Sequence, residues 1–347
     1  AFQRPLLSGA VPSSVRAGAG VAVYPTDGDS PTQLMKAAEE AACRAGEGSS
    51  GQLVFSSAEL HADERRRQSI REGIGPALEN NEFVLHYQPM LGLGSGEVVA
   101  VEALIRWQHP QRGLIPPMDF IPVAEQTGQI VPLGKWVLAT ACRQARDWQA
   151  QGLRVRMAVN LSARQFAAPD LVDFVARTLK ETGLDPSLLE LELTESVLVE
   201  DEASVGILER LRGLGVHVAI DDFGTGFSSL SYLTRFPLDT IKLDRTFITR
   251  ATRDRDAASV LSSMIAMVHG LGLRTVAEGV ETSEQQRLLI AHGCDLVQGF
   301  LHSPPLPAEA CQHWLSEHVT RALRPIPGGA QPEPPVRVIQ AGLHHTG

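Results

Sequence analysis

From about residue 65 to residue 323, short apolar runs that end in polar residues alternate with longer stretches of helical, amphipathic spacing. Short apolar runs bounded by turn residues predict β-strands, whereas apolar positions spaced three to four residues apart predict helices. Eight strands are predicted, at residues 83–88, 98–102, 155–160, 189–192, 216–221, 240–244, 275–278 and 294–298. Helices are predicted between them, including residues 133–150, 171–182, 203–214 and 284–292. This alternation over roughly 250 residues indicates an α/β fold, a closed (β/α)₈ TIM-type barrel.

The connection between the first two predicted strands breaks this regularity. It consists only of residues 91–96, Leu-Gly-Leu-Gly-Ser-Gly. A parallel pair needs a crossover of a dozen or more residues, whereas a short glycine-rich link suits a hairpin. We therefore expect one antiparallel strand in an otherwise parallel barrel.

Two flanking zones differ from the barrel in composition. Residues 1–60 are rich in Gly, Ala and Ser and predict a small α+β segment: a strand at 20–24, a helix at 30–45 and a strand at 52–55. Ser30 is the expected N-cap of that helix and Pro31 its first residue. Residues 324–347 contain five prolines and a Gly-Gly pair and predict a flexible tail. The expected domains are thus 1–60, 65–323 and 324–347.

Charge and composition exclude some classes of function. The chain has 31 Lys and Arg against 40 Asp and Glu, a formal net charge of -9. A protein that holds long nucleic acid normally carries a basic surface, so such a partner is not expected. A small phosphorylated ligand stays open, because a local site can be cationic or metal-bound inside an acidic protein.

Membrane and redox signals are equally sparse. The most apolar stretch, residues 260–273, is interrupted by Ser262, Ser263, His269 and Gly270, and no run reaches the roughly 18 residues of a membrane helix. The four cysteines are scattered without a CxxC pair, which indicates reduced thiols and a cytoplasmic location. Because the sequence begins at Ala1, we expect a fragment whose parent carries upstream sequence, with membrane tethering left open.

Polar residues end the predicted strands, and in such a barrel these ends meet at one mouth, where the active site lies. Any one of them alone would more simply be a structural hydrogen-bonding group. Five converging carboxylates would repel one another unless cations neutralised them, and oxygen ligands without Cys favour Mg²⁺ or Mn²⁺ over zinc. The residues at these ends are Glu102, Asn160, Glu192, Asp221, Asp222, Lys242, Glu278 and Gln298.

The adjacent pair Asp221-Asp222 has two interpretations. Consecutive strand residues face opposite ways, but a strand end running into Gly224 and Gly226 can turn both toward the mouth. One carboxylate could then bridge two ions about 3.5–4 Å apart, as in two-metal phosphoesterases. The alternative is that the pair only caps a turn that the glycines permit.

The motifs along the barrel resemble one known family, the EAL-domain cyclic di-GMP phosphodiesterases. The first is the ExLxR signature, and the others follow in the family's order through the whole barrel zone. They are Glu102-Ala103-Leu104-Ile105-Arg106, Asn160-Leu161-Ser162, Glu192-Leu193-Thr194-Glu195, Asp221-Asp222-Phe223-Gly224-Thr225-Gly226, Lys242-Leu243-Asp244, Glu278-Gly279-Val280-Glu281 and Gln298-Gly299-Phe300.

The resemblance implies a role for each matching position. Two Mg²⁺ or Mn²⁺ ions would be held by Glu102, Asn160, Glu192, Asp221, Asp222 and Glu278, with Asp221 bridging. Lys242 would contact the attacking water, and Lys242, Glu278, Glu102 and Gln298 would form the catalytic set. Glu195 would anchor the loop after Asp222. Substrate contacts would come from Arg106, Gln88, Glu281 and Phe300.

The function implied by the resemblance is hydrolysis of cyclic di-GMP to linear pGpG by a hydroxide activated between two metal ions. The main alternative is a catalytically silent cyclic di-GMP receptor that signals through a protein partner, although Glu102, the Asp pair and Lys242 are all retained. A glycosidase with paired carboxylates is a third class, which requires fewer acidic groups. Lys242 could also form a merely internal ion pair with Asp244 or Asp222.

The leading zone is similar to the C-terminal third of a GGDEF, or diguanylate cyclase, domain. The similarity rests on Gly20-Val21-Ala22-Val23-Tyr24-Pro25 and on the helix up to Ala45, and no GGDEF-type signature occurs in the chain. Gly46 stands where the family has a triphosphate-binding lysine. The resemblances thus imply an upstream sensory or GGDEF region in the parent protein, and a homodimer formed through helices beside the Asp221-Asp222 loop.

Overall fold

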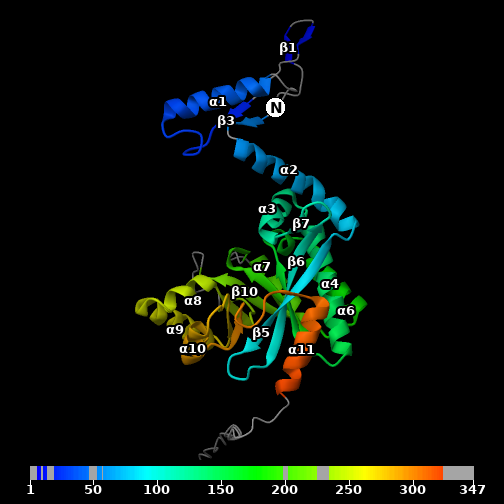
Figure 1. The fold of residues 1–347 in the computed structure, drawn as a ribbon. Helices are drawn as coiled ribbons and strands as arrows, with labels where there is room; N and C mark the ends of the chain where they lie inside the picture. Colours follow the sequence, from blue (N-terminus) through cyan, green and yellow to red (C-terminus); the bar gives the residue numbers. More distant parts are fainter. Residues whose placement is uncertain are drawn as a thin grey trace, which may run out of the picture.

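Eight strands close into a barrel, which lies below the N-terminal zone in Figure 1. The computed structural model describes residues 6–8, 11–13, 19–46, 53–56, 58–197, 202–224 and 234–322. Around the barrel the order is β5-β13-β12-β11-β10-β9-β8-β6, and pairing of β5 with β6 closes it. The barrel strands are β5 (Phe83–Gly92), β6 (Val98–His109), β8 (Arg156–Leu161), β9 (Leu189–Thr194), β10 (His217–Phe223), β11 (Thr240–Leu243), β12 (Arg274–Ala277) and β13 (Leu296–Gln298). The predicted TIM-type barrel is confirmed.

β5 is the one antiparallel strand of the closed barrel. It runs antiparallel to both of its neighbours, β6 and β13, while the remaining barrel pairs are parallel. The turn to β6 occupies residues 93–95, so the expected hairpin is confirmed. The short strand β7 (Gly113–Ile115) extends the sheet from β6, and β14 (Leu306–Pro307) extends it from β5.

Helices cover the outside of the barrel, and the first of them leads to it from the N-terminal zone (Figure 1). They are α2 (Ala58–Glu79), α3 (Pro117–Thr127), α4 (Ile130–Ala150), α5 (Ala163–Phe166), α6 (Leu171–Thr182), α7 (Glu202–Gly213), α8 (Arg245–Ala251), α9 (Arg255–Gly270), α10 (Ser283–Ala291) and α11 (Ala308–Ala322), with 3₁₀ turns at Pro186–Leu188 and Glu195–Val197. The four helices predicted by range correspond to α4, α6, α7 and α10. The apolar stretch at 260–273 lies mostly in α9. Within the described ranges, no helix combines the length and apolarity needed to cross a bilayer.

The barrel interior has an apolar floor below a polar layer. The floor consists of Met90, Ala100, Ala158, Val276 and Leu296, all nearly fully buried. Strand side chains alternate between the two faces, so residues two positions away point into the same interior. A polar residue lies two positions from each floor residue, on the side nearer the mouth. These residues are Gln88, Glu102, Asn160, Glu278 and Gln298. On β5 that residue precedes its floor partner, because this strand runs the opposite way.

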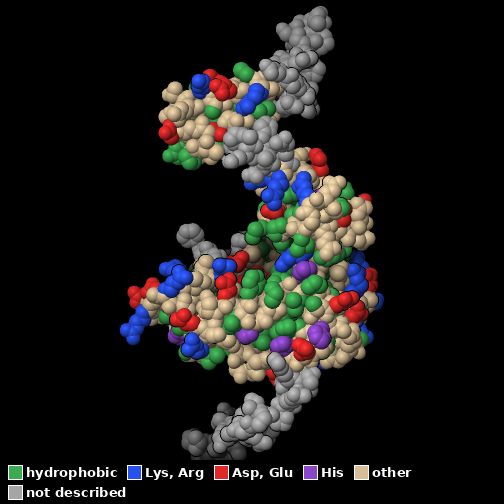
Figure 2. Space-filling view, viewed as in Figure 1, with side chains coloured by type: hydrophobic (Ala, Val, Ile, Leu, Met, Phe, Trp, Pro, Cys, Tyr) green, Lys and Arg blue, Asp and Glu red, His purple; other side chains and the backbone are tan. Residues whose placement is uncertain are grey.

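A second, larger core lies between the barrel and its helices, with Trp107, Phe120 and Trp148 almost fully buried. It holds the strands in place from outside. On the face shown in Figure 2, Lys and Arg side chains lie in separate groups near α2 and near α8 and α9, with Asp and Glu among them. The exclusion of long nucleic acid stays a prediction from charge.

The N-terminal zone contains the expected strand–helix–strand sequence. β3 (Ala19–Val21) and β4 (Leu53–Phe55) pair in parallel, and α1 (Pro31–Gly46) contacts both strands. Ala41, Ala45 and Val54 form its small core. Before it, β1 (Leu6–Ser8) pairs with β2 (Val11–Ser13). The predicted tail at 324–347 lies outside the described residues.

Candidate active site

Lys242 lies at the centre of the polar layer, almost completely buried on β11. Its Nζ is 2.6 Å from Glu278 Oε1 and 3.0 Å from Glu192 Oε2. Two further carboxylates approach it, Asp221 Oδ1 at 3.4 Å and Glu102 Oε2 at 3.6 Å. Four strand ends therefore direct their acidic groups at one ammonium, as the predicted convergence of strand ends requires.

This crowding controls the protonation of Lys242 and Glu192. Burial by itself lowers the pKa of Lys242, but the surrounding carboxylates outweigh it and raise that pKa well above its ordinary value. Burial raises the pKa of Glu192 well above its usual range, and the nearby carboxylates add to this effect against the attraction of Lys242. The layer thus contains more negative charge than its single ammonium can balance.

Glu278 and Glu102 respond differently to the same surroundings. Burial, with the charges of Asp221 and Glu102, raises the pKa of Glu278 to about 8 against the opposing effect of Lys242. Burial would also raise the pKa of Glu102, but Lys242 and hydrogen bonds from Gln298 and Asn160 reverse the shift and lower it. Glu102 is thus held as a carboxylate, while Glu278 is ready to exchange a proton for a cation.

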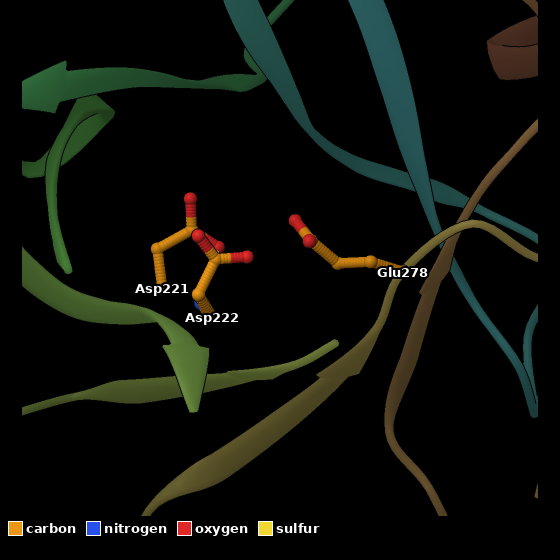
Figure 3. A group of neighbouring side chains, drawn as sticks. All are labelled: Asp221, Asp222 and Glu278. Carbon is orange, nitrogen blue, oxygen red and sulfur yellow. The ribbon is translucent and has the colours of Figure 1, made fainter. Parts of the chain in front are cut away.

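Asp221 and Asp222 both present carboxylates to the mouth, facing Glu278 across it (Figure 3). One oxygen from each of the three lies within 4.8 Å of the others. The backbone achieves this at Asp222 itself, where φ is 54° and the register against β11 shifts between Ile220 and Phe223. Asp tolerates this left-handed conformation better than most residues. The sequence placed the turn at the glycines, whereas the structure begins it at Asp222.

Two amide side chains brace Glu102 from either side. Asn160 Nδ2 donates to Glu102 Oε1 at 2.6 Å, and Gln298 Nε2 donates to Glu102 Oε2 at 2.6 Å. Gln298 also donates to Gln88 Oε1 at 3.0 Å. Both carboxylate oxygens of Glu102 are therefore fixed in direction, which suits a ligand that must meet a cation in a defined geometry.

Glu195 is placed to hold the loop that follows the Asp pair. It lies in the 3₁₀ turn after β9, and its Oε2 accepts a hydrogen bond from the backbone N–H of Gly224 at 3.1 Å. Gly224 has φ +91°, and a Cβ there would lie 2.7 Å from the ring of Phe247. The rest of the Asp-Asp-Phe-Gly-Thr-Gly loop, beyond residue 224, lies outside the described residues.

An open cavity of about 230 Å³ lies over the polar layer. Its wall includes Gln88, Phe300 and Glu281, with Phe300 66% exposed. Sequence reasoning missed Arg245, which also lines this cavity and lies 4.0 Å from Glu281. The sequence feature that could have identified Arg245 is its position immediately after the strand-end segment Lys242-Leu243-Asp244.

Arg106 and Asp244 lie close to this layer with different partners. Burial lowers the pKa of Arg106, and the charge of Glu102 opposes the shift. The guanidinium of Arg106 donates to the carbonyl of Ile105 at 2.8 Å. Asp244 accepts a hydrogen bond from the backbone N–H of Thr246 and caps α8. The ion pairs of Lys242 given above are with the carboxylates of the polar layer and not with Asp244.

The donor set fits divalent cations. Five carboxylates and an asparagine amide offer hard oxygen ligands, and no Cys or His lies among them. Both carboxylate oxygens of Glu192 are buried without a hydrogen-bond partner among the described residues, and the Lys242 ammonium lies 3.0 Å from Oε2. Such under-coordinated acidic groups match the requirements of Mg²⁺ or Mn²⁺.

Comparisons with known proteins agree with the motifs. Residues 68–305 match the family model described as "EAL domain". The chain is 46% identical over 298 residues to "Bifunctional diguanylate cyclase/cyclic di-GMP phosphodiesterase MucR" of Pseudomonas aeruginosa, which covers 85% of this chain and 43% of that protein. It is 40% identical over 304 residues to "Cyclic di-GMP phosphodiesterase PdeR" of Escherichia coli, covering 87% and 46%.

A solved structure described as "PaMucR Phosphodiesterase, c-di-GMP complex" matches with a TM-score of 0.67 and 48% identity. It covers 71% of this chain and 99% of that one. The chain belongs to the EAL domain family, as its motifs predicted. It spans less than half the length of the two curated relatives above.

Proposed function

We propose that the barrel hydrolyses cyclic di-GMP to linear pGpG with two divalent metal ions. The observation that carries this proposal is the excess of buried carboxylates around Lys242 at the barrel mouth. The curated relatives with 46% and 40% identity are named as cyclic di-GMP phosphodiesterases, which supports the same activity here.

The metal ligands are assigned from this arrangement and from the family motifs. Glu102, Asn160, Glu192 and Asp221 would hold one ion, and Asp221 would bridge to a second ion held with Asp222 and Glu278. The short separations among the carboxylates of Asp221, Asp222 and Glu278 support the second site. When bound, two Mg²⁺ or Mn²⁺ ions supply Lewis acidity and lower the pKa of a coordinated water toward neutrality.

The protein groups would then orient the reactants. In the reaction one P–O bond forms to water, the P–O3′ bond breaks, and the 3′ oxygen takes a proton. Lys242 would direct the attacking oxygen by donating a hydrogen bond, since its raised pKa keeps it an ammonium without metal. Arg106 would pair with a substrate phosphate. Glu281 and Phe300, on the cavity wall, would contact a guanine.

The remaining proposals concern the setting of the barrel. We expect Glu195 to keep the Asp221-Asp222 loop in its metal-binding geometry through Gly224. The four cysteines are free thiols, which supports a cytoplasmic setting. The family resemblance further suggests a homodimer through helices beside that loop, a GGDEF-like unit within residues 1–60, and an upstream sensory or GGDEF region in the parent protein.

The decisive experiment is incubation of the purified chain with cyclic di-GMP and Mg²⁺ or Mn²⁺, with and without EDTA, followed by chromatography of the products. We expect linear pGpG only in the presence of metal. Intact cyclic di-GMP under all conditions would contradict the proposal. A binding titration on the same sample would then show whether the chain acts as a receptor.

A further inference from the structure

A continuous line of hydrogen bonds crosses the seam where the barrel closes. Gln88 Nε2 on β5 donates to the backbone carbonyl of Ser303 at 3.1 Å. Gln88 Oε1 accepts from Gln298 Nε2 on β13 at 3.0 Å, and the same nitrogen donates to Glu102 Oε2 on β6 at 2.6 Å. Gln88, Glu102, Gln298 and Ser303 are each at most 8% exposed. Bulk water therefore competes little for the hydrogen bonds of this line, although Gln88, Glu102 and Gln298 border the cavity at the mouth.

The two ends of this line fix its direction. A backbone carbonyl and an ionised carboxylate can only accept hydrogen bonds. Gln88 must therefore turn its NH₂ toward Ser303 and its oxygen toward Gln298. Gln298 must in turn direct its NH₂ at both Gln88 and Glu102. Reversing either amide would place two acceptors against each other in a buried setting, at considerable cost.

This arrangement leaves one atom without a partner. Gln298 Oε1 is buried and accepts no hydrogen bond from the described residues. An unpaired buried acceptor beside an acidic metal-binding layer is costly unless a donor arrives during function. A reacting water is such a donor.

We propose that Gln88 is a positioning residue, which locks the amide of Gln298 so that Oε1 is presented to the reacting water and Glu102 is held in its ligating direction. This inference rests on the proposed function and gives Gln88 a role different from substrate contact. Its two polar atoms already have protein partners. Its effect on turnover would therefore pass through Gln298 and Glu102.

The test is a double-mutant cycle with Gln88→Met, Gln298→Met and the double variant. Loss of an outer partner of a metal ligand typically costs about 10–100-fold in metal affinity or activity. For Gln88→Met we expect kcat to fall about tenfold and KM to change less than about twofold. The double variant should be no slower than Gln298→Met alone, because Gln88 acts through that residue.

A matched control removes a buried hydrogen bond to a carboxylate at the other end of the barrel. Thr240 is 1% exposed, and its Oγ1 donates to Glu190 at 3.2 Å. Thr240→Val should lower thermal stability without changing kcat or KM. Gln88→Leu replaces Gln88→Met if the latter is unfolded at the assay temperature.

Three outcomes would overturn the proposal: a raised KM with unchanged kcat in Gln88→Met, additive losses in the double variant, or no effect of Gln88→Met. Titration with Mn²⁺ alone separates this test from the proposed function. Even if the wild-type chain fails to turn over cyclic di-GMP, Gln88→Met and Gln298→Met should weaken Mn²⁺ binding non-additively. Unchanged Mn²⁺ affinity in both single variants would contradict the positioning role.

Discussion

The two ends of the barrel interior both bury charge, but they balance it differently. At the N-terminal end, Arg156 Nη1 pairs with Glu190 Oε2 at 3.0 Å, and Thr240 donates a further hydrogen bond to the same carboxylate. At the mouth, Lys242 alone faces the carboxylates of four strand ends. At the N-terminal end the buried carboxylate of Glu190 has a cationic partner, whereas at the mouth the described carboxylates outnumber the ammonium.

This difference separates stability from function in one scaffold. A buried pair contributes little net stability, but removal of one partner leaves an uncompensated charge and is strongly destabilising. Unmatched carboxylates raise one another's pKa values and lower stability until a cation binds. We therefore expect substitutions at the N-terminal end to affect folding, and substitutions at the mouth to affect metal binding and turnover.

The largest expected effect is on turnover, from Asp221→Ala at the mouth. Loss of the proposed bridging ligand removes several kcal/mol of charge stabilisation, so kcat should fall on the order of 10³-fold or more. Glu102→Ala should behave in the same way. In Asp221→Ala the thermal midpoint of the metal-free protein should not fall, because one repelling carboxylate is gone, whereas Glu102→Ala should lower it, since the amides of Asn160 and Gln298 lose their acceptor. Near-normal turnover in either variant would refute the two-metal assignment.

Lys242→Ala should reduce kcat by about 10²–10³-fold while changing KM much less, since a group that orients the attacking oxygen acts mainly in the transition state. The metal-free variant should also be less stable than wild type, because the ammonium at the centre of the layer is lost, and Mg²⁺ should restore part of that stability. Lys135→Ala, which removes a half-exposed ion pair with Asp170, is the matched control. Equal losses in kcat and in substrate affinity would refute the role of Lys242.

At the N-terminal end, Arg156→Met should lower the free energy of unfolding by about 3–5 kcal/mol, because Glu190 would stay buried without its partner. Urea denaturation measures this change, and kcat of the folded protein should stay close to wild type. The control is Arg154→Met, two residues before Arg156, which breaks an exposed ion pair with Asp185. It should lower the free energy of unfolding by at most about 1 kcal/mol. If both variants lost the same stability, the contrast between the two ends would fail.

The smallest effect is a pH dependence of metal binding. The pKa of Glu278, raised to about 8 mainly by burial, means that a proton occupies this group near neutrality when metal is absent. A cation must displace that proton, so Mn²⁺ affinity should rise at least about tenfold per pH unit up to about pH 8, with Glu192 adding to the dependence because its pKa is also raised. Calorimetric titrations at several pH values would measure how the logarithm of the Mn²⁺ affinity changes with pH, which gives the number of protons released on binding. In Glu278→Gln this number should be smaller by about one. A pH-independent affinity would contradict this assignment.

The same proton has the opposite effect on folding. Because the pKa of Glu278 is higher in the folded state than the ordinary value of 4.5, the metal-free folded protein binds more protons than the unfolded chain between those values. The contribution of Glu278 to stability should therefore decline as pH rises from about 4.5 to about 8.

Much of this site was predictable because it depends on local pattern. The apolar runs located the strands, and the fold class then placed Glu102, Glu192 and Lys242 at a common mouth. Contacts that depend on register between distant strands were not predictable. The hydrogen bond between the side-chain amides of Gln88 and Gln298 joins residues 210 positions apart, and no local sequence pattern predicts that these amides face each other. The positive φ of Asp222 likewise has no counterpart in the local sequence pattern, which placed the turn at the glycines.

The closing seam has a consequence for how the protein is made. Ser303 and Gln88 are 215 positions apart, and Gln298 is 196 positions from Glu102. These contacts can form only after the last barrel strand has left the ribosome and docked beside the first. Contacts of such sequence separation slow folding, because loop closure must come first. A nascent chain would thus contain most of the acidic ligands yet lack the geometry to use them until synthesis of the barrel is complete.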